Sequence, residues 1–550
     1  MSDEAKTLAG PNGGDVLVAL MDVLGIDTAF GVVSVHNLPL VDAIARDRRF
    51  VPVRHEAAAV NAADAYGRAR GGIGLAITST GTGAGNAAGS LVESLSAGSS
   101  VLHITGQIES QYLGQGRGFI HETKDQVTML GAVSKSAYSI NTASSVADIL
   151  HGAALESLEA PSGPVSVEWP IDLQYAVYDV PVFEPAASNH RPPEAESLAE
   201  AVRLIGQAKR PLIWVGGGAV RARSATEELV NRTRAGVFAS NSGRGVLNSG
   251  HGSYIGNFAT SPACAQLWRE ADLLLSIGTH FRSTETSDYS LMLPRPHVQI
   301  DIDPASIGRT YPCDVGVVAD ASVAVRALLD ALPGRTATQD DWLARVAGAR
   351  RNARLLLREQ IGWQASICDA VRSAFPRGAV MARDVTIASS TWGNRLLAID
   401  DPTCNIFAHG GGIGQGLAMA IGAAISRPDL PTLALVGDGG LSVHFGELLT
   451  LAQERPWLLL LIFNDRGYGV LRNTQDVFVS RRSGVDLTTP DFSALAQSMG
   501  LPYWPVGDLN DIEDALAAAL SVRGPAVVEV VVDQMGAMPT PFTPPVRIPQ

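Results

Sequence analysis

The sequence predicts an α/β protein made of doubly wound parallel sheets, and three observations support this. Short apolar runs alternate with helix-like amphipathic stretches along most of the 550 residues, which is the rhythm of consecutive strand–helix–strand units. Many of these runs are apolar throughout, as expected for strands that are buried on both faces. Several runs are followed by a glycine-rich turn, which allows the backbone to approach a ligand closely.

Ten apolar runs are predicted to be strands. They are Phe50–Val53, Ile73–Thr78, Val101–Thr105, Val165–Trp169, Leu212–Val215, Leu273–Ile277, Val298–Ile302, Thr432–Val436, Leu458–Phe463 and Ala526–Val532. The proline-rich stretch 180–194 and the segment 333–339 indicate linkers. We therefore expect three domains and a proline-rich tail, over residues 1–180, 195–335, 360–535 and 536–550.

The composition excludes several classes of protein. Hydrophobic residues make up 46% and charged residues 18%, which is typical of a globular chain and not of a disordered one. A net charge of −13 without a basic run argues against a nucleic-acid partner. The four cysteines are far apart, which predicts a reducing compartment. The polar N-terminus and the lack of a long apolar run predict a cytoplasmic protein with no membrane partner.

Two acidic residues follow neighbouring strands of the last predicted domain. Asp438 comes after one strand and begins a helix that we expect to reach about residue 453, and Asp465 follows the next strand, 27 residues later. The carboxyl ends of parallel strands form the ligand-binding edge of such a sheet. Two carboxylates with loop carbonyls suit Mg²⁺, and glycine N–H groups at a helix N-terminus suit phosphate. The structural alternative is a helix cap at Asp438 and a simple turn at Asp465.

A glutamate lies at the start of a predicted helix in the first domain. Glu56 follows the strand that ends at Val53, and the helix-like stretch after it ends at Gly71. A carboxylate in the first turn of a helix is mildly stabilising, so Glu56 taken alone has a purely structural explanation.

The segments around these acidic residues resemble the family of thiamine-diphosphate (ThDP) enzymes. The GDGG turn and the later Asn-Asp pair are similar to the ThDP motif of that family. The resemblance implies that the side chains of Asp438 and Asp465 and the carbonyl of Gly467 hold Mg²⁺. The diphosphate would lie against three glycines, Gly437, Gly439 and Gly440. Asp465 replaces the more common asparagine and adds a negative charge to the metal site.

The string RHEAAAVNAADAYGRARG at 54–71 resembles the glutamate helix of the same family. It implies that Glu56 hydrogen-bonds the pyrimidine N1′ of ThDP and promotes the imino form that deprotonates the thiazolium C2. That carbon then attacks a substrate carbonyl, and the ring serves as an electron sink.

Two glycine-rich loops extend the resemblance. In GGGIGQG at 410–416, the carbonyl of Gly411 is implied to bond the 4′-amino group, and Ile413 to wedge the cofactor into a bent conformer. In GTGAGN at 81–86, Gly83 and Asn86 match a Gly-Pro-Gly-x-x-Asn loop, with threonine in place of proline.

The resemblance covers nearly the whole chain, in the order pyrimidine-binding, middle and diphosphate-binding domain. The family members that look most similar are acetolactate synthase, benzoylformate decarboxylase and benzaldehyde lyase. Because active sites of this family lie between two subunits, a homodimer or homotetramer is implied. FAD in the middle domain is possible but unsupported, since VGGGAV at 215–220 is too short to establish dinucleotide binding.

Two histidines are candidates for proton transfer to the substrate. His36 aligns with the active-site histidine of benzaldehyde lyase, although a loop histidine that caps the next helix is the alternative. His121 aligns with an active-site glutamine of that enzyme, where a histidine near its pKa could move a proton. His55, His280 and His409 are weaker candidates.

The resemblance implies a lyase or carboligase that depends on ThDP and Mg²⁺ and acts on a 2-oxo acid, an aldehyde or a 2-hydroxy ketone. The segment Tyr468–Arg472 favours a benzoylformate decarboxylase-like enzyme over an acetolactate synthase. Three possibilities stay open: a 2-oxo acid decarboxylase, an acyloin-forming or acyloin-cleaving enzyme, and a catalytically silent ThDP-binding regulatory subunit. The presence of Glu56 and Asp438 argues against the silent subunit.

Overall fold

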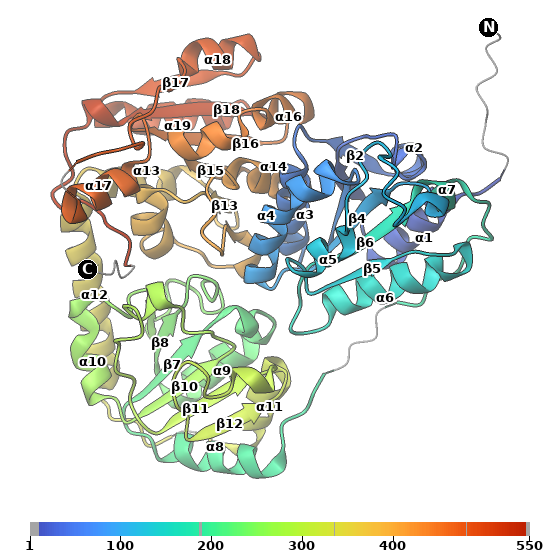
Figure 1. Ribbon diagram of the computed structural model, residues 1–550. Coiled ribbons are helices and arrows are strands. Elements are labelled where there is room, and N and C mark those ends of the chain that lie inside the picture. The colour runs from blue at the N-terminus through green and yellow to red at the C-terminus, as the bar shows by residue number, and fades with distance from the viewer. Residues whose placement is uncertain (1–9, 186–189, 335, 480, 546–550) are drawn as a thin grey trace, which may run out of the picture.

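The computed structural model describes residues 10–185, 190–334, 336–479 and 481–545. These residues form three domains, each built on a six-stranded sheet. Every strand pairing in the three sheets is parallel. Helices pack on both faces of each sheet (Figure 1). The predicted fold class, three doubly wound parallel sheets, is confirmed.

The first domain has the strand order β2-β1-β3-β4-β6-β5. Its strands are β1 (Thr28–Gly31), β2 (Arg49–Pro52), β3 (Gly74–Thr78), β4 (Val101–Gln107), β5 (Ser136–Ser139) and β6 (Val165–Pro170). Its helices are α1 (Gly13–Leu24), α2 (Leu38–Asp47), α3 (Glu56–Arg70), α4 (Thr82–Ala97), α5 (Gln126–Gly131), α6 (Val146–Leu158) and α7 (Ile171–Tyr175). Helices α1, α2 and α6 cover one face of the sheet, and α3, α4 and α5 cover the other.

Local sequence explains where α3 and α4 begin and end. α3 begins at Glu56 because His55 is extended and its ring nitrogen accepts the N–H of Ala57. It ends where Gly71 adopts a φ of +72°, which glycine tolerates without strain. α4 follows Gly81, whose φ is +62° and where a Cβ would lie 2.2 Å from the carbonyl oxygen of His121. Both the backbone conformation and this close approach therefore require glycine at position 81.

The middle domain has the strand order β12-β11-β10-β7-β8-β9. Its strands are β7 (Pro211–Val215), β8 (Gly236–Ala239), β9 (Tyr254–Gly256), β10 (Leu273–Ile277), β11 (His297–Asp301) and β12 (Val315–Val318). Its helices are α8 (Ala195–Gln207), α9 (Arg223–Thr233), α10 (Ala265–Glu270) and α11 (Ala321–Ala331). In the VGGGAV segment, a Cβ on Gly216 would lie 2.1 Å from the carbonyl oxygen of Gly278. Close packing of two turns accounts for a glycine at position 216.

The third domain has the strand order β14-β13-β15-β16-β18-β17, and the long helix α12 (Trp342–Ile361) leads into it. Its strands are β13 (Val380–Arg383), β14 (Asn405–Phe407), β15 (Thr432–Gly437), β16 (Leu458–Asn464), β17 (Tyr503–Val506) and β18 (Ala526–Val531). Its helices are α13 (Gln364–Ala374), α14 (Gly416–Ser426), α15 (Asp438–Leu441), α16 (Glu447–Glu454), α17 (Gly469–Phe478), α18 (Phe492–Ser498) and α19 (Ile512–Ser521).

The helix that was expected to run from Asp438 to about residue 453 is interrupted. α15 ends at Leu441 and α16 begins at Glu447. The interruption places the buried carboxylate of Glu447 where it accepts the N–H of Arg54 at 2.9 Å and the hydroxyl of Thr450 at 2.6 Å. The bond from Arg54 to Glu447 therefore attaches the segment that precedes α3 to the third domain.

The domains share their hydrophobic cores. One cluster of buried side chains joins α3 of the first domain to α14 of the third, and another joins the middle and third domains through α12. At the first junction, a Cβ on Gly422 would lie 2.0 Å from the carbonyl oxygen of Ala62. Because α3 lies between its own sheet and α14, most of its residues are buried, including the polar Asn61 and Asp64. Of the helices described, none is long and apolar enough to cross a membrane.

Candidate functional site

The acidic pair of the third domain lies at the carboxyl ends of two neighbouring strands. β15 and β16 pair in parallel up to Gly437 and Phe463, and Asp438 and Asp465 follow. The carboxylate of Asp438 accepts the N–H of Asp465 at 3.2 Å and the N–H of Gly467 at 2.8 Å. These bonds hold the two acidic residues and the Gly467 backbone together.

The environment of the pair favours a bound cation. Burial, followed by the charge of Asp438, raises the pKa of Asp465 to about 7, and burial raises the pKa of Asp438. One oxygen of Asp465 is buried and makes no hydrogen bond to the described residues. The guanidinium of Arg472 lies 3.9 Å from this oxygen. A divalent cation would supply the missing partner and neutralise both carboxylates, so the residues present fit a metal ion.

Neighbouring glycines leave room for this arrangement. A Cβ on Gly439 would lie 2.5 Å from the carbonyl oxygen of Gly467, and a Cβ on Gly469 would lie 1.8 Å from a carboxylate oxygen of Asp465. Among the residues that the structure describes, there is no group of three or more His, Cys, Asp and Glu side chains placed to hold a metal. The remaining ligands would therefore come from backbone carbonyls and from a bound molecule.

A cavity of about 550 Å³ opens onto the acidic pair. Seven of the predicted cofactor and metal residues line it: Gly411, Ile413, Gly437, Asp438, Gly440, Asp465 and Gly467. Gly439 packs beneath the Gly467 carbonyl. Much of the remaining wall is apolar and includes Val470, Leu471 and Met538. The cavity thus combines an acidic end with an apolar wall.

Met538 and Pro541 come from the proline-rich tail and also line the cavity. The proline content of the tail is compatible with a course over the surface or over the mouth of a site, and it does not single out either residue. Arg472 lines the cavity too, and its guanidinium bonds Asp486 at 2.7 Å.

Glu56 lies in a second cluster, on the first domain. Its carboxylate accepts the side-chain N–H of Asn86 at 3.0 Å, and a Cβ on Gly83 would lie 3.0 Å from its other oxygen. The three predicted residues Glu56, Gly83 and Asn86 are therefore together. Glu56 is half-buried and does not line the cavity at Asp438. Within one chain, the two halves of the predicted cofactor site are separate.

His36 and His121 lie together on the first domain. Their ring centroids are 5.4 Å apart. His36 is 3% exposed, and neither of its ring nitrogens makes a well-formed hydrogen bond to the described residues. Burial, and to a smaller extent His121, lowers the pKa of His36. A buried neutral imidazole whose nitrogens make no well-formed hydrogen bond to the described residues is available to a ligand.

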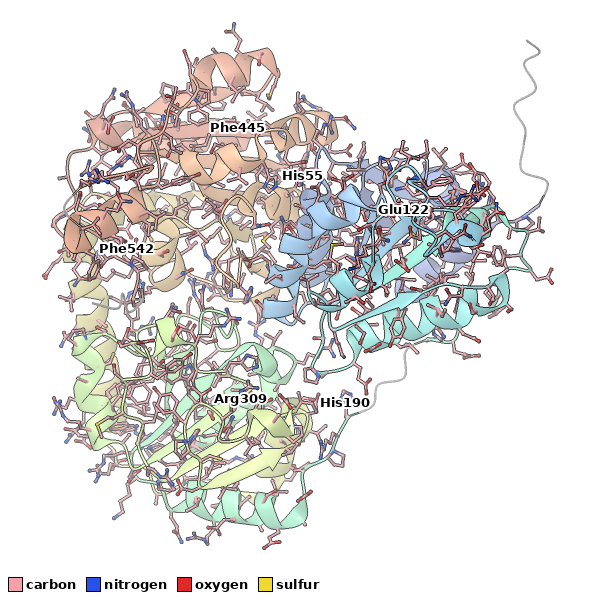
Figure 2. All side chains as sticks on the ribbon, in the orientation of Figure 1. His55, Glu122, His190, Arg309, Phe445 and Phe542 are labelled. Atoms are coloured by element: carbon pink, nitrogen blue, oxygen red, sulfur yellow. The ribbon has the colours of Figure 1, made fainter. Side chains whose placement is uncertain are left out.

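The backbone around both histidines is well supported. The carbonyl of His36 accepts a side-chain N–H of Gln174 at 2.8 Å, and a Cβ on Gly106 would lie 2.3 Å from that carbonyl. The loop with His121 is folded by Glu122, whose carboxylate accepts three backbone N–H groups, including that of Gly118 at 2.9 Å. Figure 2 labels Glu122 on the first domain.

The weaker histidine candidates have structural roles. His55 caps α3 and its ring lies 5.1 Å from that of His444, where the first and third domains meet (Figure 2). His409 stacks on Phe407 with centroids 3.9 Å apart, and burial lowers its pKa well below the ordinary value. The side chain of His280 is exposed, its carbonyl accepts the hydroxyl of Thr310 at 3.1 Å, and partial burial of its ring lowers its pKa.

Comparison with known proteins identifies the family. Three family models match: the N-terminal TPP binding domain of thiamine pyrophosphate enzymes over residues 11–129, their central domain over 198–328, and their C-terminal TPP binding domain over 387–530. Thiamine pyrophosphate (TPP) is another name for ThDP. The matched regions contain the three sheets, apart from β5, β6 and β13 and the last residue of β18.

Several named proteins are similar to this chain over most of its length. A probable 2-ketoarginine decarboxylase of Pseudomonas aeruginosa is 32% identical, over 96% of this chain and 94% of that protein. The acetolactate synthase large subunit of Parasynechococcus marenigrum is 30% identical, over 96% and 89%. The large subunit of acetolactate synthase isozyme 2 of Escherichia coli is 26% identical, over 95% and 96%. Together with the two TPP-binding domains and the site geometry, these matches show that the chain belongs to the thiamine pyrophosphate enzyme family.

Proposed function

We propose that this protein is a lyase that uses ThDP and Mg²⁺ to remove carbon dioxide from a 2-oxo acid. The observation that carries the proposal is the buried Asp438 beside the half-buried Asp465, at one end of an otherwise largely apolar cavity of about 550 Å³. An acidic end suits a metal-bound diphosphate, and an apolar wall suits a reaction that converts a carboxylate into a neutral molecule. The named 2-ketoarginine decarboxylase relative supports this reaction type.

The residues of the third domain would bind and orient the cofactor. Asp438, Asp465 and the carbonyl of Gly467 would hold Mg²⁺, which neutralises the diphosphate. Gly437, Gly439 and Gly440 flank Asp438 in the sequence, and their backbone N–H groups would face the diphosphate. Gly411 and Ile413 line the same cavity and would orient the pyrimidine half. When bound, ThDP supplies a nucleophilic carbon for the substrate carbonyl and a ring that accepts the electrons of the broken bond.

The residues of the first domain would take part in proton transfer. Glu56 is oriented by its hydrogen bond with Asn86, and it would share a proton with the pyrimidine ring nitrogen. Neither ring nitrogen of His36 makes a well-formed hydrogen bond to the described residues, and His121 lies beside it, so this pair would hold or donate a proton at the substrate oxygen. The apolar wall formed by Val470, Leu471 and Met538 would exclude water from the broken bond.

We also propose that the working form is at least a homodimer, with the first domain of one subunit facing the third domain of another. Glu56 does not line the cavity of its own chain, so a second copy would have to bring the two halves together. Apolar side chains are exposed near the His36–His121 pair, namely Val33 at 50%, Val35 at 59% and Ile120 at 62%. Such a cluster suits burial against a second subunit.

A substrate panel tests the reaction. The protein loaded with ThDP and Mg²⁺ would be offered pyruvate, benzoylformate, branched 2-oxo acids, 2-ketoarginine, acetoin and benzoin, while carbon dioxide and aldehyde are measured together. Carbon dioxide with an equal amount of free aldehyde is the expected result. Carbon dioxide with an acyloin would instead favour the acetolactate synthase-like carboligase, which the acetolactate synthase relatives support. Aldehyde without carbon dioxide would contradict decarboxylation and indicate an acyloin lyase.

A further inference from the structure

The glycine run 410–416 is held by two buried carboxylates. Glu93 of α4 accepts the N–H groups of Gly410 and Gly412, both at 2.6 Å. Asp384 accepts the N–H of Gly414 at 3.0 Å and that of Gly416 at 3.2 Å. The side chains of Glu93 and Asp384 are 4% and 3% exposed. Four alternate N–H groups of the run are thereby directed into the protein.

The residues between these donors face the other way. Gly411 and Ile413 line the cavity at the acidic pair. Because the N–H groups on either side of Gly411 are both bound to Glu93, the Gly411 backbone is fixed relative to α4. Short hydrogen bonds to a charged acceptor are about twice as strong as neutral ones, so this attachment is firm.

Glycine at positions 410 and 412 is needed for this contact. A Cβ on Gly410 would lie 2.8 Å from a carboxylate oxygen of Glu93, and a Cβ on Gly412 would lie 2.6 Å from the same oxygen. A larger residue at either position would push the carboxylate away. The glycines at positions 410 and 412 therefore leave the space that the Glu93 carboxylate occupies.

α4 links this contact to the other half of the site. Gly83 and Asn86, in the first two turns of α4, touch Glu56. Further along α4, Ser90 donates a hydrogen bond to Gln415 at 3.2 Å, and the carbonyl of Ser96 accepts one from Arg282 of the middle domain at 2.6 Å. One helix thus supports both the glutamate of its own first domain and the glycine run of its own third domain.

We propose that Glu93 is a positioning residue for the cofactor, which it serves by fixing the Gly410–Gly412 backbone so that Gly411 and Ile413 face the bound ThDP. This inference rests on the proposed function, which places ThDP in that cavity. Glu93 itself does not line the cavity. Its effect is on how well the loop is preformed for binding.

The variant Glu93→Gln tests the proposal. An amide keeps one acceptor but turns its NH₂ group toward an N–H donor, so one of the two bonds is lost. At saturating Mg²⁺, we expect the Kd for ThDP, measured by quenching of tryptophan fluorescence, to rise about tenfold. The matched control is Glu168→Gln, which alters a buried carboxylate of the same domain that bonds Gln107 and Gln126 and not the glycine run. That control should lower Tm but change the Kd less than twofold.

A second variant keeps the test valid if Glu93→Gln folds poorly. Gly412→Ala displaces the Glu93 carboxylate from the other side of the contact, so it should raise the Kd for ThDP as well. In the double variant the two effects should not add, because both act through one contact. A folded Glu93→Gln protein with the ThDP affinity of the wild type would overturn the proposal. Wild-type protein that fails to bind ThDP would instead overturn the proposed function, so the two failures are distinguishable.

Discussion

At the scale of single residues, Glu56 is the sharpest test of the proposed chemistry. Glu56→Gln removes the group that would share a proton with the pyrimidine ring, while Asn86 and Gly83 stay in place. We expect kcat to fall by roughly a hundredfold or more, which is the usual contribution of a positioned acid or base. The Kd for ThDP should change little, because the metal and diphosphate contacts lie on another domain.

The control for this change is Glu109→Gln, which alters a half-buried residue whose carboxylate accepts a side-chain N–H of Gln111 at 2.7 Å. It should leave kcat and ThDP binding unchanged. A Glu56→Gln protein with the wild-type rate would show that Glu56 is not the activating residue.

The raised pKa of Asp465 predicts how the stability of the metal-free protein depends on pH. Its pKa is raised from 3.8 to about 7 in the folded state, so the folded protein holds this proton more tightly than the unfolded chain does. The contribution of this proton to folding stability is complete below the pKa of Asp465 in the unfolded chain, and it is lost as pH rises from about 4 through 7. With the metal removed by a chelator, Tm should therefore fall over this range, and it should fall less in Asp465→Asn.

Mg²⁺ with ThDP should remove most of this pH dependence in the wild type, because a bound cation stabilises the charged form of Asp465. Thermal scans at several pH values, with and without both ligands, make the comparison. Equal slopes of Tm against pH in the metal-free wild type and in metal-free Asp465→Asn would contradict this account of Asp438 and Asp465.

At the scale of elements, the packing of α3 on α14 constrains the sequence closely. A Cβ on Gly422 would lie 2.0 Å from the carbonyl oxygen of Ala62, so Gly422→Ala forces the two helices apart. We expect a loss of about 1–3 kcal/mol in the free energy of unfolding, measured by urea denaturation. The control is Gly348→Ala in α12, where the nearest atom lies 4.0 Å from the new Cβ. There alanine should stabilise the helix by about 0.5–1 kcal/mol.

The strands show what sequence patterns can and cannot predict. Runs such as Leu458–Phe463 are apolar throughout because β16 is buried between two neighbouring strands and two helix layers, and such runs are visible in the sequence. β9 spans only Tyr254–Gly256, and β13 ends in the buried Arg383, which bonds Asn405 at 2.8 Å. Apolar runs this short cannot be told from buried helix segments by pattern alone, so pairing with neighbouring strands decides that they are strands.

The residues of the candidate site also differ in how well the sequence predicts them. Asp438, Asp465 and Glu56 follow strands at recognisable turns, so spacing and family resemblance single them out. Glu93 gives no such signal, because it lies in the middle of a helix and its role depends on a loop 317 residues away along the chain. Long-range contacts of this kind are not visible in local sequence patterns.

At the scale of the whole molecule, the separation of Glu56 from the acidic cavity predicts complementation between inactive variants. Glu56→Gln disables the first-domain half of a site, and Asp438→Ala disables the third-domain half. In a mixed dimer with sites between subunits, one site carries both defects and the other carries none. If subunits exchange freely, half of the dimers are mixed, so the mixture should recover about a quarter of wild-type activity.

The measurement is activity after the two inactive proteins are mixed, partly unfolded together and refolded with ThDP and Mg²⁺. Each variant refolded alone is the control and should stay inactive. A site formed within one chain would give no recovery, because every Glu56 would then act only with the Asp438 of its own subunit. Recovery that scales with the fraction of mixed dimers, measured by native mass spectrometry, would establish that the half-site on one first domain works with the metal pair of another subunit.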